Sequence, residues 1–217
     1  MNLVFLGPPG SGKGTLAERL SSELNIPHIS TGDILREETK LGTPLGKRVK
    51  LFMETGELVP DKIILEVMKE RIRKPDCQKG FLLDGFPRTM PQALGLDDVL
   101  KESTKSIDLV LKFEVSEDSV LKRLGGRLIC SGCGADFNLY TKPPQRDLIC
   151  DFCGSKLYQR PDDAKEVTLN RLRVYKQETL PVEEYYNKQG KLRKVNGELE
   201  PDAILKNVLN MLESQSK

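Results

Sequence analysis

The sequence predicts an α/β fold, in which a parallel β-sheet is covered by helices on both faces. The prediction rests on the alternation of short apolar runs with longer amphipathic stretches along the 217 residues. It also rests on a glycine-rich loop, GPPGSGKGT (7–15), which joins the first apolar run to the first helical pattern. Two stretches, residues 30–59 and 126–163, depart from the alternation and are expected to be insertions into one core.

Four apolar runs are expected to be buried strands, because they are short and are bounded by glycine, proline or charge. They are LVFLG (3–7), IPHIS (26–30), FLLDG (81–85) and LVLKFEV (109–115). Helical patterns lie between and after them, at residues 13–24, 61–74 and 200–214. The second helix is expected to begin at Asp61, directly after Pro60. The last pattern places its apolar residues on one helical face, namely Ile204, Leu205, Val208, Leu209 and Leu212.

The amino-acid composition and net charge argue against several classes of protein. Hydrophobic residues make up 38% and charged residues 30%, as in soluble globular proteins. The 34 basic and 32 acidic residues leave a net charge of +2, too balanced to indicate a polyanionic partner by charge alone. No apolar run is long enough to span a membrane, and the first ten residues lack the basic region of a signal peptide. We therefore expect a cytoplasmic protein, whose five cysteines favour metal binding or free thiols over disulfides.

The glycine-rich loop fits the pattern Gly-x-x-x-x-Gly-Lys, with Gly7, Gly12 and Lys13 at the fixed positions. Glycines let the backbone aim several N–H groups at one phosphate, and the helix N-terminus adds positive charge. The alternative is an ordinary tight turn, but the order of strand, loop and helix favours phosphate binding. Gly14 occupies the position where a general P-loop has the Mg²⁺-binding hydroxyl, which argues against a direct bond from Thr15 to the ion and leaves contact through water as the alternative.

Asp84 is expected at the carboxyl end of the strand FLLDG, where open α/β sheets bind ligands. Its carboxylate could hold Mg²⁺ or the waters of that ion, or it could simply cap a turn. The phosphate loop favours the metal-binding role. The histidine, His28, lies in an apolar run and is expected to be packed rather than catalytic.

Two Cys-x-x-Cys pairs, Cys130/Cys133 and Cys150/Cys153, have the spacing of a four-thiolate zinc ribbon. Four thiolates fill a tetrahedral site and leave no position for a substrate, so the metal is expected to be structural; iron and cobalt are alternatives to zinc. A ribbon could instead indicate a nucleic-acid-binding ATPase. Residues 130–153 carry two basic and three acidic residues, which argues against a reader of phosphate backbones. Cys77 stands alone and is expected in a loop, without a role.

Several spaced motifs together resemble the adenylate kinase family over the whole chain. They are GPPGSGKGT (7–15), STGDILR (30–36), ETGELVP (54–60), DGFPRT (84–89) with Gln92, and QRPDD (159–163). The cysteine segment resembles the long lid of the bacterial zinc-containing members. The resemblance implies a P-loop NTPase-like core with a five-stranded parallel sheet. It also implies the reaction MgATP + AMP ⇌ 2 ADP, which serves adenine nucleotide homeostasis and AMP salvage. The attacking group is then the AMP phosphate, so no protein nucleophile is needed.

The resemblance divides the chain into three parts. The core domain comprises residues 1–29, 60–125 and 164–217, the AMP-binding insert residues 30–59, and the zinc-binding lid residues 126–163. We expect the two inserts to move on the core about Pro60, Gly125-Gly126 and Pro161, because closure excludes water from an activated phosphoryl group. Lid motion is expected to limit turnover, and the protein is expected to be a monomer.

Residue roles are carried over from the family by position. The residues implied in catalysis are Lys13, Asp84, Arg88, Arg123, Arg160 and Arg171. Those implied in binding ATP are Gly10, Ser11, Gly12, Lys13, Gly14, Thr15, Arg127, Asp136, Phe137 and Leu199. Arginine suits these phosphate contacts because it is always charged and offers a planar fork of donors. Asp162 and Asp163 resemble the family pair that holds the lid arginines.

The first insert and the DGFPRT motif are implied in binding AMP. The residues are Thr31, Arg36, Glu57, Leu58, Val59, Gly85, Phe86, Pro87, Arg88, Gln92, Arg160 and Arg171. Arg36 and Arg88 would grip the phosphate, and Pro87 resembles a cis-proline. The Gln92 amide can pair with two groups of adenine at once, which favours AMP over UMP or CMP. A UMP/CMP kinase, a GTP-dependent kinase and a regulatory nucleotide-binding module remain as alternatives.

Overall fold

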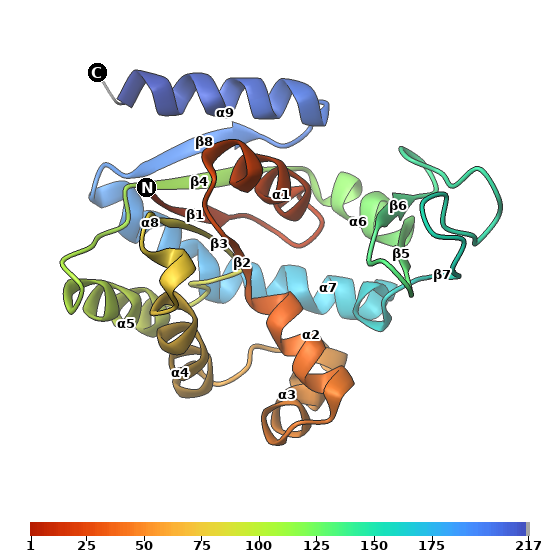
Figure 1. Cartoon of the computed structure of the whole chain (residues 1–217), viewed down its shortest axis with the longest axis horizontal. Helices are drawn as coiled ribbons and strands as arrows, with labels where there is room; N and C mark the ends of the chain where they lie inside the picture. Colours follow the sequence, from red (N-terminus) through yellow and green to blue (C-terminus); the bar gives the residue numbers. More distant parts are fainter. Residues whose placement is uncertain (216–217) are drawn as a thin grey trace.

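The computed structural model describes residues 1–215 and is built on one five-stranded sheet (Figure 1). The strand order is β2-β3-β1-β4-β8, and all neighbouring pairs are parallel. The strands are β1 (Asn2–Leu6), β2 (His28–Ser30), β3 (Phe81–Asp84), β4 (Leu109–Glu114) and β8 (Leu192–Asn196). The four predicted apolar runs form the first four strands, and the predicted parallel α/β core is confirmed. The last two residues of the expected core domain, 216 and 217, lie outside the described part.

Helices cover both faces of the sheet. The α-helices are α1 (Lys13–Leu24), α2 (Thr31–Leu41), α3 (Pro44–Thr55), α4 (Asp61–Ile72), α5 (Met90–Lys101), α6 (Glu117–Gly125), α7 (Lys165–Val174), α8 (Leu180–Lys188) and α9 (Pro201–Gln215). Shorter elements are the 3₁₀ turns η1 (Pro75–Cys77) and η2 (Pro161–Asp163), and the π-helical segment η3 (Tyr175–Thr179) between α7 and α8. None of the helices within residues 1–215 combines the length and apolarity that crossing a membrane requires.

The alternation of side chains along β1 explains why its run is apolar throughout. Leu3 and Phe5 pack with α1 and α9 on one face, whereas Val4 and Leu6 pack with α4, α5 and α8 on the other. A strand buried on both faces has no solvent side and therefore needs no polar residues. The edge strand β8 is different, because only Val195 of its five residues is buried. Its exposed polar residues kept it out of the predicted apolar runs.

Residues 31–55 form two helices that pack against each other at one side of the core (Figure 1). Ser30 begins α2 by accepting a hydrogen bond from the Asp33 N–H at 3.2 Å, and Thr43 begins α3 by accepting one from the Gly46 N–H at 3.0 Å. A Cβ on Gly46 would meet the Glu38 carbonyl oxygen at 2.0 Å, so only glycine permits this approach. The segment is helical, in agreement with its lack of strand-like runs.

Residues 127–158 form a separate three-stranded antiparallel sheet (Figure 1). Its strands are β5 (Arg127–Cys130), β6 (Asp136–Asn138) and β7 (Leu157–Tyr158), in the order β6-β5-β7. The core of this sheet contains five buried residues, which are Leu128, Cys130, Phe137, Cys150 and Leu157. So small an apolar cluster contributes little folding free energy without a further cross-link.

Cys77 differs from its prediction. It lies in η1 rather than in an irregular loop, and its side chain is fully buried in the main apolar cluster. Arg71 Nη1 lies 3.1 Å from its sulfur. The polar neighbours in KPDCQKG concealed this burial, because a single small thiol gives no periodic signal.

Candidate active site

The chemistry-bearing segments all follow the carboxyl ends of the parallel strands. Residues 7–12 follow β1, Thr31 follows β2, and residues 85–89 follow β3. Parallel strands bring these ends to one edge of the sheet, where ligands of open α/β folds bind. The topology therefore gathers segments that are far apart in sequence at a single place.

The loop between β1 and α1 has the shape of a phosphate cradle. Gly10 and Gly12 have φ values of 72° and 90°, a left-handed region that favours glycine. Gly12 is the N-cap of α1 and has no side chain to satisfy the first N–H groups of the helix. Those N–H groups are therefore available to an anion.

Lys13 turns back onto its own loop in the free protein. Its Nζ donates hydrogen bonds to the Gly7 carbonyl at 2.9 Å, the Pro8 carbonyl at 2.7 Å and Ser11 Oγ at 3.0 Å. Burial lowers the Lys13 pKa from 10.5 to about 8, with Arg88 and Arg171 adding to the effect and Asp84 opposing it. Burial and the two arginines therefore disfavour the Lys13 ammonium in the free protein, and an anion bound beside it would offset their effect.

ATP binding is expected to bring proton uptake by Lys13 at about pH 8.5. With a pKa of about 8 in the free protein, much of Lys13 is neutral at this pH. Bound phosphates raise the pKa again and restore the ammonium, so ATP affinity should fall as the pH rises above 8. Calorimetry in two buffers of different ionisation enthalpy should show an uptake of roughly 0.5–1 proton. The Lys13→Met variant should lose the uptake; equal heats in both buffers for the unmodified protein would contradict the prediction.

Asp84 ends β3 and lies close to the loop. A Cβ built on Gly14 would be 3.7 Å from Asp84 Oδ2, and His28 Nε2 is 3.5 Å from the same oxygen. Burial opposes ionisation of Asp84, but His28 and Lys13 outweigh it and hold the Asp84 pKa below its ordinary value. His28 is packed as predicted, yet it faces this carboxylate, which its apolar run did not indicate. The ionised carboxylate is a suitable oxygen ligand for Mg²⁺ or its waters.

Three of the predicted arginines form ion pairs with Asp162 and Asp163. Arg171 Nη1 lies 3.1 Å from Asp162 Oδ2, and Arg36 Nη1 lies 3.6 Å from the same oxygen. Arg127 Nε donates to Asp163 Oδ2 at 2.7 Å. Burial lowers the Arg171 pKa to about 10. These guanidinium groups are held at the site before any ligand binds.

A pocket lies between the core and α2–α3, and it receives most of the residues expected to bind AMP. Its apolar wall includes Leu35, Phe52, Met53 and Ile64. The predicted residues that line it are Thr31, Arg36, Glu57, Leu58, Val59, Gly85, Arg88, Gln92 and Arg171. Phe86 is fully buried behind it, and the Phe86–Pro87 bond is cis, as expected. Arg160 does not line the pocket, and its Nη2 lies 3.9 Å from Asp33 Oδ1 on α2.

The residues expected to contact the ATP base, or to contact ATP from the lid, do not line this pocket. Arg123 Nη2 lies 3.5 Å from Glu198 Oε2, next to Leu199, which is 40% exposed. Asp136 lies on β6 of the small sheet. The neighbouring Phe137 is buried in that sheet's core, so a contact of Phe137 with ATP would use its backbone.

Three residues that touch this machinery were not singled out for a role by the sequence. Thr179 Oγ1 donates to the Arg88 carbonyl at 2.9 Å, and Asp61 Oδ1 accepts from Gln92 Nε2 at 2.8 Å. Glu198 Oε1 accepts from the Ser116 N–H at 2.8 Å, which fixes the turn before Leu199. For Asp61 the sequence predicts only a helix start. No motif spacing links these partners.

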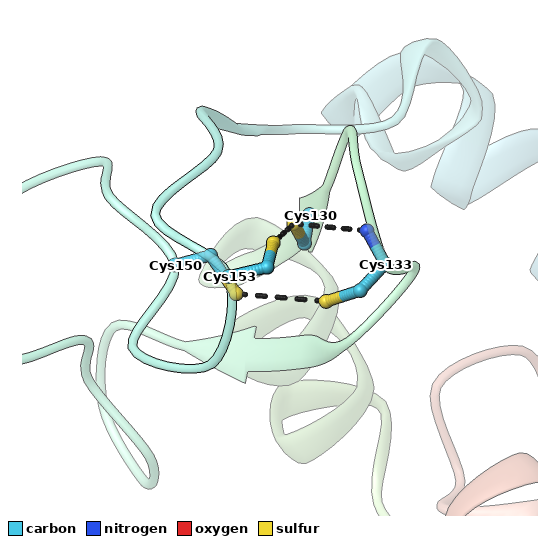
Figure 2. A group of neighbouring side chains, drawn as sticks. All are labelled: Cys130, Cys133, Cys150 and Cys153. Atoms are coloured by element: carbon cyan, nitrogen blue, oxygen red, sulfur yellow. Dashed lines mark hydrogen bonds between the residues drawn. The ribbon is translucent and has the colours of Figure 1, made fainter.

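The four paired cysteines converge as their spacing predicts (Figure 2). Their sulfurs all lie within 4.8 Å of one another, with Cys130 and Cys153 at 3.3 Å and Cys133 and Cys150 at 3.7 Å. A tetrahedral zinc–thiolate site has sulfurs about 3.8 Å apart. The Gly132 and Cys133 N–H groups point to the Cys130 sulfur at 3.3 and 3.4 Å, which supports a thiolate. The donor set and its geometry therefore fit zinc.

One edge of the sheet carries a loop that can hold phosphate and, beside it, a separate pocket lined by arginines. The loop suits a donor nucleotide and the pocket an acceptor nucleotide. This arrangement puts the chain in the class of P-loop nucleotide kinases. Within that class, the family model for adenylate kinase matches residues 5–191. The chain belongs to the adenylate kinase family.

Relatives of similar length support the same assignment. An adenylate kinase of Thermosipho africanus is 52% identical over 212 residues, which cover 98% of this chain and 99% of the relative. An adenylate kinase of Archaeoglobus fulgidus is 51% identical and covers 98% of both chains. An adenylate kinase of a Geobacillus species is 48% identical with the same coverage.

Proposed function

We propose that this chain catalyses the reversible transfer of the terminal phosphoryl group of ATP to AMP, giving two ADP in the presence of Mg²⁺. The observation that carries the proposal is the position of Lys13 relative to the pocket. Arg88 and Arg171, which line the pocket, are near enough to lower the Lys13 pKa. A phosphate on the loop and a phosphate in the pocket would therefore share one cluster of cations, as phosphoryl transfer requires.

Each group has a role that its surroundings support. Lys13 and the loop N–H groups bind the donor phosphates, while Arg36 and Arg88 bind the phosphate of the acceptor. Arg123, Arg127, Arg160 and Arg171 neutralise charge that spreads over the transferring oxygens. Mg²⁺, when bound, would neutralise charge on the donor phosphates, and Asp84 would hold the ion or its waters. Zinc on the four cysteines stiffens the lid and takes no part in the chemistry.

Residues 30–59 and 126–163 are proposed to close over the core as near-rigid bodies. Closure would bring the lid arginines to the phosphates and exclude water, which prevents wasteful hydrolysis. Relaxation-dispersion measurements test whether this motion limits turnover. Opening rates well above kcat, together with fast product release, would contradict that part of the proposal.

The test of the reaction is a coupled assay with AMP, GMP, UMP and CMP as acceptors and with ATP and GTP as donors. ADP formation from ATP and AMP, at rates well above those of the other acceptors, is the expected result. A preference for UMP or CMP would replace the acceptor, and no turnover with any pair would leave a regulatory module. We propose a cytoplasmic monomer that acts on small nucleotides; salt-dependent DNA binding at micromolar concentration would count against this.

A further inference from the structure

The Gln92 side chain is held by two partners of fixed and opposite polarity. Its Oε1 accepts a hydrogen bond from the Arg88 backbone N–H at 2.8 Å, and its Nε2 donates one to Asp61 Oδ1 at 2.8 Å. The N–H can only donate, and a carboxylate can only accept. Together they fix which end of the amide is oxygen and which is nitrogen, a choice that partners able both to donate and to accept, such as hydroxyl groups, leave open.

Asp61 is itself held in place. It is the first residue of α4, and its Oδ1 also accepts a hydrogen bond from Thr89 Oγ1 at 2.9 Å. Thr89 Oγ1 in turn accepts from the Gln92 N–H at 3.2 Å. The start of α4 is thereby tied to the first turn of α5 by a closed ring of hydrogen bonds. Thr89 and Gln92 are only 7% and 2% exposed, so water competes little with their part of this ring, whereas Asp61 is half-buried.

Gln92 lines the pocket between the core and α2–α3, whereas Asp61 does not line it and instead lines an adjoining hollow with Pro60 and Thr89. After its bonds to Asp61 and Arg88, the Gln92 amide retains one N–H and one oxygen lone pair for a ligand. Adenine complements this pair, because its N1 accepts and its 6-amino group donates. Hypoxanthine has the opposite pattern, because its N1–H donates and its O6 accepts.

We propose that Asp61 is a positioning residue that sets the purine specificity of the pocket by fixing the orientation of the Gln92 amide. The inference rests on the proposed function, since it takes this pocket as the AMP site. Asp61 touches no substrate and acts through Gln92. Without the carboxylate, the Gln92 N–H loses its acceptor, and only the Arg88 N–H still favours the original orientation, so the turned amide becomes more populated. The turned amide places its oxygen opposite N1 of the purine. Adenine N1 is an acceptor and is repelled there, whereas the N1–H of hypoxanthine can donate to this oxygen.

The test compares Asp61→Ala with Asp61→Asn by measuring kcat/KM for AMP and for inosine monophosphate, with ATP as donor. The ratio of the two values is independent of the folded fraction, because both come from the same preparation. In Asp61→Ala the ratio should fall about tenfold, chiefly through a higher KM for AMP. In Asp61→Asn most of the discrimination should return, because one Asn oxygen can accept both bonds that Asp61 Oδ1 accepts.

Asp76→Asn is the matched control. It removes a carboxylate that pairs with Arg71 at 2.8 Å beyond the far end of α4, away from the pocket, and should leave the ratio unchanged. Gln92→Ala separates this inference from the proposed function. Gln92→Ala could lose the discrimination while the ratio for Asp61→Ala stays within about twofold of that of the unmodified protein. This result would overturn the role of Asp61 and leave the proposed function standing. If Gln92→Ala leaves AMP kinetics unchanged, the assignment of the pocket to AMP is overturned.

Discussion

Replacing Arg88 with alanine is expected to lower kcat for ADP formation by about 10³-fold, equivalent to about 4 kcal/mol of transition-state stabilisation. Arg88 lines the pocket, and its Nε donates to the Gly85 carbonyl at 2.8 Å, which fixes the direction of the guanidinium. Burial lowers the Arg88 pKa below its ordinary value, so this cation is held in poorly solvated surroundings before an anion arrives. Steady-state kinetics with ATP and AMP measure the effect.

The stability of the Arg88→Ala variant is expected to remain near that of the unmodified protein. Removing a desolvated cation relieves repulsion from Arg36 as well as removing contacts. Arg73→Ala is the matched control, because Arg73 is exposed and pairs with Glu102 on the surface at 2.5 Å. A fall in kcat of less than about tenfold for Arg88→Ala would contradict its role in holding the acceptor phosphate for transfer.

Removing zinc is expected to unfold residues 127–158 and to lower the melting temperature by about 10 °C, while the core keeps its ATP site. The small sheet has a core of only five buried residues, so the metal supplies much of its folding free energy. Calorimetric melting before and after chelation measures the first effect. Retained proton uptake on ATP binding measures the second, because Lys13 lies on the core.

Single cysteine substitutions provide the controls for this experiment. Cys133→Ser should lose bound zinc and melt like the chelated protein, because it removes one of four converging ligands. Cys77→Ser should keep its zinc, because Cys77 is buried in the main apolar cluster, apart from the metal centre. Unchanged melting of the chelated protein would show that the small sheet holds itself together without metal.

Much of the fold could be predicted because its signals are local. Helices α1 and α4 begin at Lys13 and Asp61 as predicted, and both starts depend on neighbouring residues alone. The strands in the middle of the sheet are recognisable because burial on both faces demands apolar residues. The edge strand β8 has one covered side chain among five, and its residues carry no comparable signal.

The candidate site divides in the same way. The phosphate loop and the paired cysteines are contiguous or closely spaced, so residue type and spacing by themselves determined them. Only the tertiary structure decided that Thr179 binds the Arg88 carbonyl, that Glu198 binds the Ser116 N–H and that Asp61 binds the Gln92 amide. Asp61 and Gln92 are 31 residues apart on different helices, and neither sequence segment specifies the other. They meet because α4 and α5 pack side by side under the sheet, and such packing depends on the whole core rather than on a local pattern.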